Sequence, residues 1–283
     1  MLFAWLASLI YAATAIFGKL TTRHVVANQW LFNFFWNLFI CAAIVPVALF
    51  FGAGMPDEWG ILVVAGILLF FVNTLYTLAL YRLDVSVIGP LYNFRSVFTA
   101  LLGAAFLGEV LTGSQYALII IIFVSGIFLN VDERFKLRAF LRKESVIGLL
   151  AVLASALFGF AVKASIAANG FWDTSLWTEI IAQALMLGTL PLFYRDVHAT
   201  RMRTYLGIFA LGLLSAVGEL AANKAYGINV TISSAIIAIP FSMLIAFVFS
   251  VFAPRLLEKH SIRVYAIRFI AAAVIIVAAI ELS

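Results

Sequence analysis

Long apolar runs, separated by short polar stretches, repeat along the whole chain. A helix needs about 20 mostly apolar residues to cross the hydrocarbon core of a bilayer. Such runs are found at residues 2–20, 30–51, 59–82, 86–107, 114–131, 145–167, 175–194, 204–226, 230–252 and 262–281. The runs do not alternate between apolar and polar positions, as the strands of a membrane barrel would. Because lipid cannot hydrogen-bond the backbone, the sequence predicts an all-α integral membrane protein with ten transmembrane helices.

The composition excludes several other classes of protein. Hydrophobic residues make up 65% of the chain and charged residues 11%, whereas soluble domains average roughly 45–50% and about 25%. The single cysteine, Cys41, cannot form a disulfide within the chain, and the three histidines fall in predicted loops. The sequence has no metal motif, no phosphate-binding glycine loop and no nucleophile elbow. We therefore expect no metal, no cofactor, no nucleic-acid partner and no enzymatic activity.

The basic residues concentrate on one predicted face of the membrane. With ten spans, that face holds 13 of the 18 Lys and Arg residues: twelve in the loops at 20–29, 82–86, 131–144, 195–203 and 253–262, and Arg263 at the start of the tenth run. Positively charged loops stay cytoplasmic. The sequence therefore predicts a multi-pass protein of a bacterial-type inner membrane, with the basic loops cytoplasmic and both termini outside. One miscounted early span would invert this orientation.

The two halves of the chain resemble each other weakly. Segments 7–19 and 151–163 share identical residues at four positions, separated by an offset of 163 − 19 = 144 residues: Ala7/Ala151, Leu9/Leu153, Ala12/Ala156 and Lys19/Lys163. Identities in apolar sequence can also arise by chance. Five spans per half is an odd number, so a repeat would be inverted, with the substrate site between the halves near the bilayer midplane. We predict a first five-helix repeat at 1–131, a basic cytoplasmic linker at 132–144 and a second repeat at 145–283, arranged around a central cavity.

A short motif at the end of the first half resembles a known family. Leu107-Gly108-Glu109, followed by Leu111-Thr112, Gln115 and Gly126, is similar to the close of the first half in the drug/metabolite transporter superfamily, in its EamA-like ten-helix group. The resemblance implies two inverted five-helix repeats, a central cavity walled by spans 1–4 and 6–9, and export or exchange of small metabolites. Tyr11 stands where the family usually has a tryptophan. The family's termini are commonly cytoplasmic, which the charge count contradicts.

A permanent positive charge lies near the middle of the fourth predicted span. Arg95 is about 14 Å into that span, where a charge costs about 2.5–3.5 kcal/mol on insertion scales. It should therefore face a cavity or a partner rather than lipid. Helical spacing places Tyr92, Arg95 and Thr99 on one side. Arg95 could lock two helices through an ion pair, or it could bind the carboxylate or phosphate group of a ligand, for which a guanidinium is well suited.

Polar stripes occur in neighbouring spans. Glu219 has Ser215 one turn before it and Asn223 one turn after it, and it could bind an ammonium group, carry a coupling proton or pair with a lysine. Asn73 and Tyr76 form a stripe in the third span, Asn37 belongs to one in the second, and Ser175, Glu179 and Gln183 form one in the seventh. Amide side chains join membrane helices as often as they line pores.

Five further charged residues in the predicted spans are expected to reach toward the membrane interfaces. They are Lys19, Lys163, Lys224, Glu179 and Arg268.

These features predict a secondary active transporter, an exporter or exchanger of small anionic or zwitterionic organic metabolites such as amino acids, working by alternating access. Arg95 would bind the carboxylate, and Glu219 with Asn73 and Asn223 would bind an ammonium group. The candidate substrate-binding residues are Arg95, Tyr92, Thr99, Glu219, Asn223, Asn73, Tyr76, Asn37 and Tyr11. The alternatives are a lipid scramblase, a non-transporting membrane protein and, less in keeping with the residues, an intramembrane enzyme. The expected partners are the metabolite, membrane lipid and a proton as one coupling option, in a monomer or homodimer.

Overall fold

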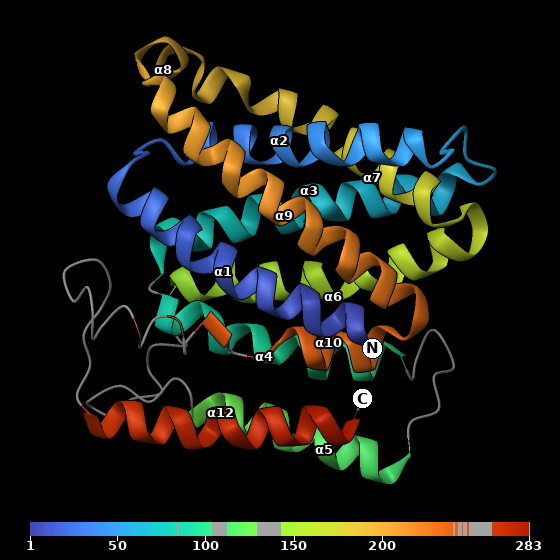
Figure 1. The fold of residues 1–283 in the computed structure, drawn as a ribbon, viewed down its shortest axis with the longest axis vertical. Helices are drawn as coiled ribbons and strands as arrows, with labels where there is room; N and C mark the ends of the chain where they lie inside the picture. The colour runs from blue at the N-terminus through green and yellow to red at the C-terminus, as the bar shows by residue number, and fades with distance from the viewer. Residues whose placement is uncertain are drawn as a thin grey trace.

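The described part of the chain is a bundle of helices without strands. The computed structural model describes residues 1–83, 85–103, 112–128, 143–239 and 262–282, together with residues 241, 242, 245 and 248. Figure 1 shows most helices running roughly parallel or antiparallel in stacked layers, while α1 (Leu2–His24) and α9 (Met202–Ile228) cross them obliquely. The predicted basic linker at 132–144 and the motif at 107–111 lie almost entirely outside the described residues, and only Lys143 and Glu144 enter a helix.

Each predicted apolar run overlaps one of these helices. In the first half they are α1 (Leu2–His24), α2 (Gln29–Phe50), α3 (Trp59–Arg82), α4 (Val85–Leu102) and α5 (Gly113–Phe128). In the second half they are α6 (Lys143–Asn169), α7 (Phe171–Met186), α9 (Met202–Ile228), α10 (Val230–Ile237) and α12 (Ile262–Leu282). The short 3-10 helix η3 (Leu187–Leu192) and the helix α8 (Tyr194–Ala199) join α7 to α9.

The predicted bounds of the seventh run were wrong at both ends. The prediction began at residue 175, but α7 begins at Phe171, directly after Gly170, whose φ of 83° lets the chain reverse immediately after α6. Glycine adopts this backbone conformation without steric cost. The α-helix ends at Met186 and continues as the 3-10 helix that contains Pro191, because a proline cannot donate the next helical hydrogen bond.

Five of the described helices are long and apolar enough to cross a membrane. They are α1, α2, α3, α6 and α9, and α5 and α12 contain shorter apolar helical segments. The chain is therefore a multi-pass membrane protein. Two of the helices begin at asparagine caps: Asn28 Oδ1 accepts from the backbone N–H groups of Trp30 and Leu31 at the start of α2, and Asn229 Oδ1 accepts from that of Ile232 in α10.

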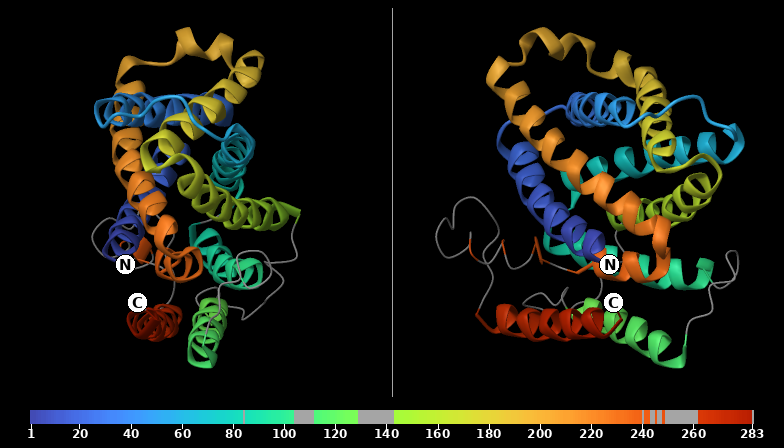
Figure 2. Two further views of the ribbon diagram at one scale, coloured as in Figure 1. Left: turned by 90° about the vertical axis from the view of Figure 1, so that its right-hand side faces the viewer. Right: turned by 45° about the vertical axis from the view of Figure 1, so that its right-hand side comes forward.

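The helices of the two halves pack across each other. The most extensive contacts join α3 to α6, α1 to α9, α3 to α7 and α2 to α9. α5 packs against α12, and these two helices form a separate layer at one end of the bundle, beyond α4 and α10 (Figures 1 and 2). The N- and C-termini lie close together in all three views.

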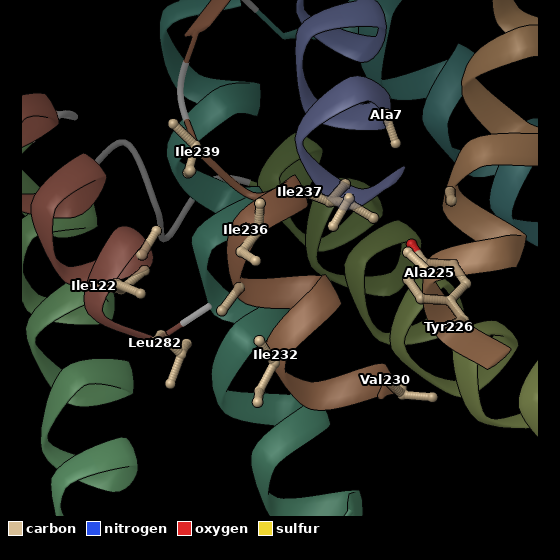
Figure 3. Packing of buried hydrophobic residues seen from close by; sticks show 14 of the residues in the cluster. Ala7, Ile122, Ala225, Tyr226, Val230, Ile232, Ile236, Ile237, Ile239 and Leu282 are labelled. Atoms are coloured by element: carbon tan, nitrogen blue, oxygen red, sulfur yellow. The ribbon is translucent and has the colours of Figure 1, made fainter. Parts of the chain in front are cut away.

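An apolar cluster joins the outer helix pair to the rest of the bundle. In Figure 3, Ile232 and Ile236 of α10 lie between Ile122 of α5 and Leu282 of α12 on one side and the α9 residues near Tyr226 on the other. These residues belong to one buried cluster, which also includes residues of α1, α3 and α6. A second buried cluster, centred on α2, α3, α4 and α9, fills the other part of the bundle. The candidate site lies where the two clusters leave polar side chains between them.

Lys19 does not reach toward the membrane interface as predicted. Its side chain is 8% exposed, and Nζ donates to the carbonyl oxygens of Leu80 and Leu83 at 2.8 and 2.7 Å. These carbonyls belong to the end of α3, where the helix dipole favours a positive charge. The prediction failed because α1 extends to His24, which places Lys19 inside the helix instead of at its end.

Close approach of α3 and α7 at Gly66 gives a direct test of the fold. A Cβ atom at Gly66 would lie 2.6 Å from Cβ and Cγ2 of Ile181. We expect Gly66→Ala to destabilise the protein by about 1–3 kcal/mol, since overpacking a well-packed interface has that typical cost. The measurement is the thermal unfolding midpoint of the purified protein in detergent. Gly60→Ala on the same helix is the control, because nothing lies within 4 Å of its added Cβ. Equal midpoints for the two variants would contradict this packing.

Candidate functional site

A cavity lies inside the bundle between helices of both halves. It is bounded by α1, α2, α3, α4, α6 and α9 and by the segment that follows α10. The space open to the centres of water-sized molecules is about 170 Å³, and roughly 150 Å³ is enough to hold benzene. The cavity can therefore accommodate a small organic molecule.

Most of the predicted site residues line this cavity. Six of the nine do so: Tyr11, Asn73, Tyr76, Tyr92, Arg95 and Glu219. They come from four helices, α1, α3, α4 and α9, so only the fold brings them together. The rings of Tyr76 and Tyr92 meet edge to face with centroids 5.7 Å apart, and they form one aromatic wall beside Arg95.

Arg95 reaches from α4 to two other helices. One of its terminal nitrogens, Nη2, donates to the backbone carbonyl of Ser155 on α6 at 3.2 Å, and the same nitrogen donates to the hydroxyl of Tyr226 on α9. The guanidinium carbon also lies 5.0 Å from the centroid of the Tyr226 ring, which is within the range of a cation–π interaction. Arg95 is 3% exposed. The protein thus holds the guanidinium firmly in place with neutral groups.

The guanidinium retains unused capacity for an anion. Its buried Nε–H has no hydrogen-bond partner, and no carboxylate forms an ion pair with it in the part of the chain that the structure describes. The interpretation of Arg95 as half of an ion pair that locks two helices is therefore not supported among these residues. Buried charges are normally paired, so a buried guanidinium that lines a cavity without an acid is suited to bind an anionic ligand.

Glu219 brings an acidic group to the same cavity. It is 7% exposed, and its Oε1 is buried without a hydrogen-bond partner. Tyr11, Tyr226 and Arg95 line the same cavity as Glu219, so the two charged groups share one polar region. The ammonium group of Lys224, five residues further along α9, lies 4.9 Å from the ring centroid of Phe171.

Three predicted site residues do not line the cavity. Asn37 lies behind Asn73, whose amide donates to it, and it donates in turn to Asn33. Thr99 is fully buried, and its hydroxyl donates to the carbonyl of Arg95 within α4, while its own carbonyl accepts from Thr231 of α10. Asn223 is 2% exposed and keeps one buried oxygen without a partner.

Sequence reasoning missed three residues that belong to this region. Tyr226 and Ser155 support Arg95, and no polar stripe in the sequence marks either of them. Glu179 was expected to reach toward the membrane interface, but its side chain is 3% exposed and its Oε1 is buried without a hydrogen-bond partner. Its position between Ser175 and Gln183, one helical turn away on each side, was the available signal.

Part of the chain matches a known family. Residues 1–131 match the model of the EamA-like transporter family. This stretch is therefore similar to EamA-like transporters. The resemblance drawn from the short motif is thereby confirmed, and the family is one of membrane transporters, not of enzymes. No match was found among curated proteins.

The fold as a whole also has a counterpart of known structure. A solved crystal structure superposes on 98% of this chain and 94% of its own, with a TM-score of 0.70 and 18% sequence identity. At this identity the likeness concerns the fold alone. It extends over both halves of the chain, whereas the family match ends at residue 131.

The cavity predicts a clear difference between two buried positions. In a Cys41→Ala background, Asn73→Cys should react with a small hydrophilic thiol reagent, because Asn73 lines the cavity. Thr99→Cys should stay unreactive, because Thr99 is fully buried against α10. Mass spectrometry of the protein in lipid vesicles measures the labelling. An unreactive Asn73→Cys would mean that the cavity does not admit water, and an equally reactive Thr99→Cys would contradict the burial of that position.

Proposed function

We propose that the protein is a secondary active transporter of small organic metabolites that carry both a carboxylate and an ammonium group, with amino acids as the leading examples. The observation that carries this proposal is the buried Arg95, which lines a cavity without an acidic partner among the described residues. A substrate carboxylate would supply the missing negative charge. Its two oxygens suit the fork of a guanidinium.

Glu219 supports the other half of the proposed ligand. A carboxyl oxygen buried without a partner costs free energy, and a substrate ammonium group would donate to it. Asn73 and the hydroxyls of Tyr11 and Tyr226 provide neutral donors and acceptors between the two charges. A zwitterion placed in this way would neutralise both ends of the cavity at once.

The helix contacts support the proposed inverted repeat. If α1–α5 correspond in order to α6, α7, α9, α10 and α12, exchanging the halves maps the most extensive helix contacts onto one another. The pairing of α3 with α6 becomes that of α1 with α9, and the pairing of α2 with α9 becomes that of α3 with α7. Two pairs of cavity-lining residues, Tyr11 with Ser155 and Arg95 with Ile239, keep the sequence offset of 144 (155 − 11 and 239 − 95).

Alternating access follows from this proposed architecture. Ten spans in two inverted repeats would place the cavity between the halves, and rocking one half against the other would expose it to each side of the membrane in turn. The polar lining lies inside the bundle, which favours a transporter over a lipid scramblase with a groove open to lipid. We propose the inner membrane as its location, with the basic loops cytoplasmic and both termini outside.

Removing the guanidinium tests this proposal. Hydrogen bonds to charged groups contribute about 1.5–3 kcal/mol, so Arg95→Gln should raise the apparent Km for transport about tenfold or more. Arg95→Lys should recover part of the loss, because it keeps the charge without the fork. The assay is counterflow of a mixture of radiolabelled L-amino acids in proteoliposomes.

Arg201→Gln is the matched control, since it removes an exposed guanidinium at the start of α9 and should leave counterflow unchanged. Each variant is first shown to elute as a single species from gel filtration. Full counterflow in Arg95→Gln would remove Arg95 from substrate binding and contradict the proposal.

A further inference from the structure

A chain of three amide side chains leads from the cavity into the contact between α2 and α3. Asn73 of α3 lines the cavity, and its Nδ2 donates to Oδ1 of Asn37 on α2. Nδ2 of Asn37 donates in turn to the backbone carbonyl and to Oδ1 of Asn33, at 2.7 and 3.1 Å. Asn33 and Asn37 are 2% and 4% exposed, and neither lines the cavity. We call Asn33, Asn37 and Asn73 the amide relay.

The backbone carbonyl of Asn33 fixes the direction of the hydrogen bonds in the relay. A carbonyl oxygen only accepts hydrogen bonds, so the atom of Asn37 that faces it has to be the donor, Nδ2. The amide of Asn37 then turns its Oδ1 toward Asn73, and Asn73 has to present its own Nδ2. Exchanging nitrogen and oxygen in either amide would place two acceptors or two donors against each other. The end of the Asn73 amide that stays available is therefore its oxygen.

Two threonines of α3 hold the buried end of the relay. Asn33 Nδ2 donates to Thr74 Oγ1 at 3.2 Å, and Thr77 Oγ1 donates to Asn33 Oδ1 at 3.0 Å. Asn33 Oδ1 thus accepts from both Thr77 and Asn37, which matches the two lone pairs of an amide oxygen. These bonds already join α2 to α3, so joining the two helices does not require the last bond, between Asn37 and Asn73.

Asn73 lies at the border between this helix contact and the cavity. Helical spacing places it between Tyr76, which lines the cavity, and Thr77, which bonds to α2. Asn73 is half-buried, and its Oδ1 accepts no hydrogen bond from the residues that the structure describes. An amide oxygen in this position is an acceptor for a ligand, as is the carboxyl group of Glu219 in the same cavity.

We propose that the amide relay holds Asn73 with its oxygen toward the cavity, so that Asn73 and Glu219 together select substrates with a primary ammonium group. This inference rests on the proposed function and deepens it, because it specifies the hydrogen-bond donors of the substrate in addition to its charge. A primary ammonium group has three N–H donors and can bond to both residues. An N,N-dimethylated ammonium group keeps the charge but has one N–H, so it can bond to only one of them.

The residues of the relay have different roles in this proposal. Asn73 contacts the substrate and determines specificity. Asn37 and Asn33 are positioning residues, which act only through the orientation of the Asn73 amide. Glu219 attracts any cation, whereas a neutral acceptor such as Asn73 gains chiefly from an N–H donor.

Competition in the counterflow assay compares the two kinds of ammonium group. Counterflow of the radiolabelled L-amino-acid mixture is inhibited with the N,N-dimethyl derivatives of the same amino acids or with their α-methyl derivatives. The α-methyl derivatives add bulk beside the ammonium group but keep its three N–H donors. The wild-type protein should require about tenfold or more of the dimethyl derivatives for half-inhibition, because one hydrogen bond to a charged group is lost.

Two variants test which residues make this distinction. Asn73→Leu, which has a similar size but no acceptor, should remove most of the difference between the two sets of competitors. Asn37→Leu leaves the Asn73 amide free to turn, so it should reduce the difference about threefold or more, as the loss of a modest hydrogen bond does. Asn28→Ser is the control and should keep the full difference. It removes an amide of α2 outside the cavity, and serine also caps helices.

The competitors decide the inference in the wild-type protein, even where a variant does not fold. Counterflow that the dimethyl and α-methyl derivatives inhibit equally would overturn the inference and leave the proposed function standing. Wild-type vesicles without amino-acid counterflow would overturn both. A folded Asn37→Leu protein that transports less but keeps the full difference would show that Asn37 only joins helices, which would overturn its positioning role.

Discussion

The organisation of this bundle depends on an ionised guanidinium, that of Arg95, which the helices hold away from bulk water and from lipid. Transferring such an ion into a protein interior costs several kcal/mol. The chain offsets part of this cost with neutral groups from two other helices, the Ser155 carbonyl of α6 and the Tyr226 hydroxyl and ring of α9. These contacts fix α4 against α6 and α9, two helices of the second half. They leave the Nε–H of Arg95 free, at the surface of a cavity.

Glu219 brings an acid to the same cavity, where its Oε1 is buried without a hydrogen-bond partner. Uncompensated charge in a poorly polar medium is expensive. A zwitterionic ligand that offers a carboxylate to Arg95 and an ammonium group to Glu219 would compensate both charges at once.

The sequence predicted the helices and much of the cavity, and its failures have identifiable causes. Apolar length located the helices, and helical spacing placed Tyr92 beside Arg95 at the cavity. The roles of Glu179 and Lys19 were wrong because predicted helix ends were wrong. α7 begins at Phe171 instead of residue 175, which puts Glu179 eight residues into the helix instead of four (179 − 171 against 179 − 175). The prediction for Thr99 was wrong because helical spacing shows which residues share a side of a helix but not what that side packs against. Arg95 of α4 lines the cavity, whereas Thr99, one turn further along the same side, packs against α10.

The central claim is that the cavity binds a carboxylate through Arg95. The most direct measurement is the thermal midpoint of the purified protein with increasing concentrations of single amino acids and of their methyl esters. Ligands that bind the folded state raise this midpoint by mass action. The account predicts a concentration-dependent rise with one or more free amino acids and none with the matching esters, which lack the negative charge. Equal stabilisation by an amino acid and its ester would contradict it.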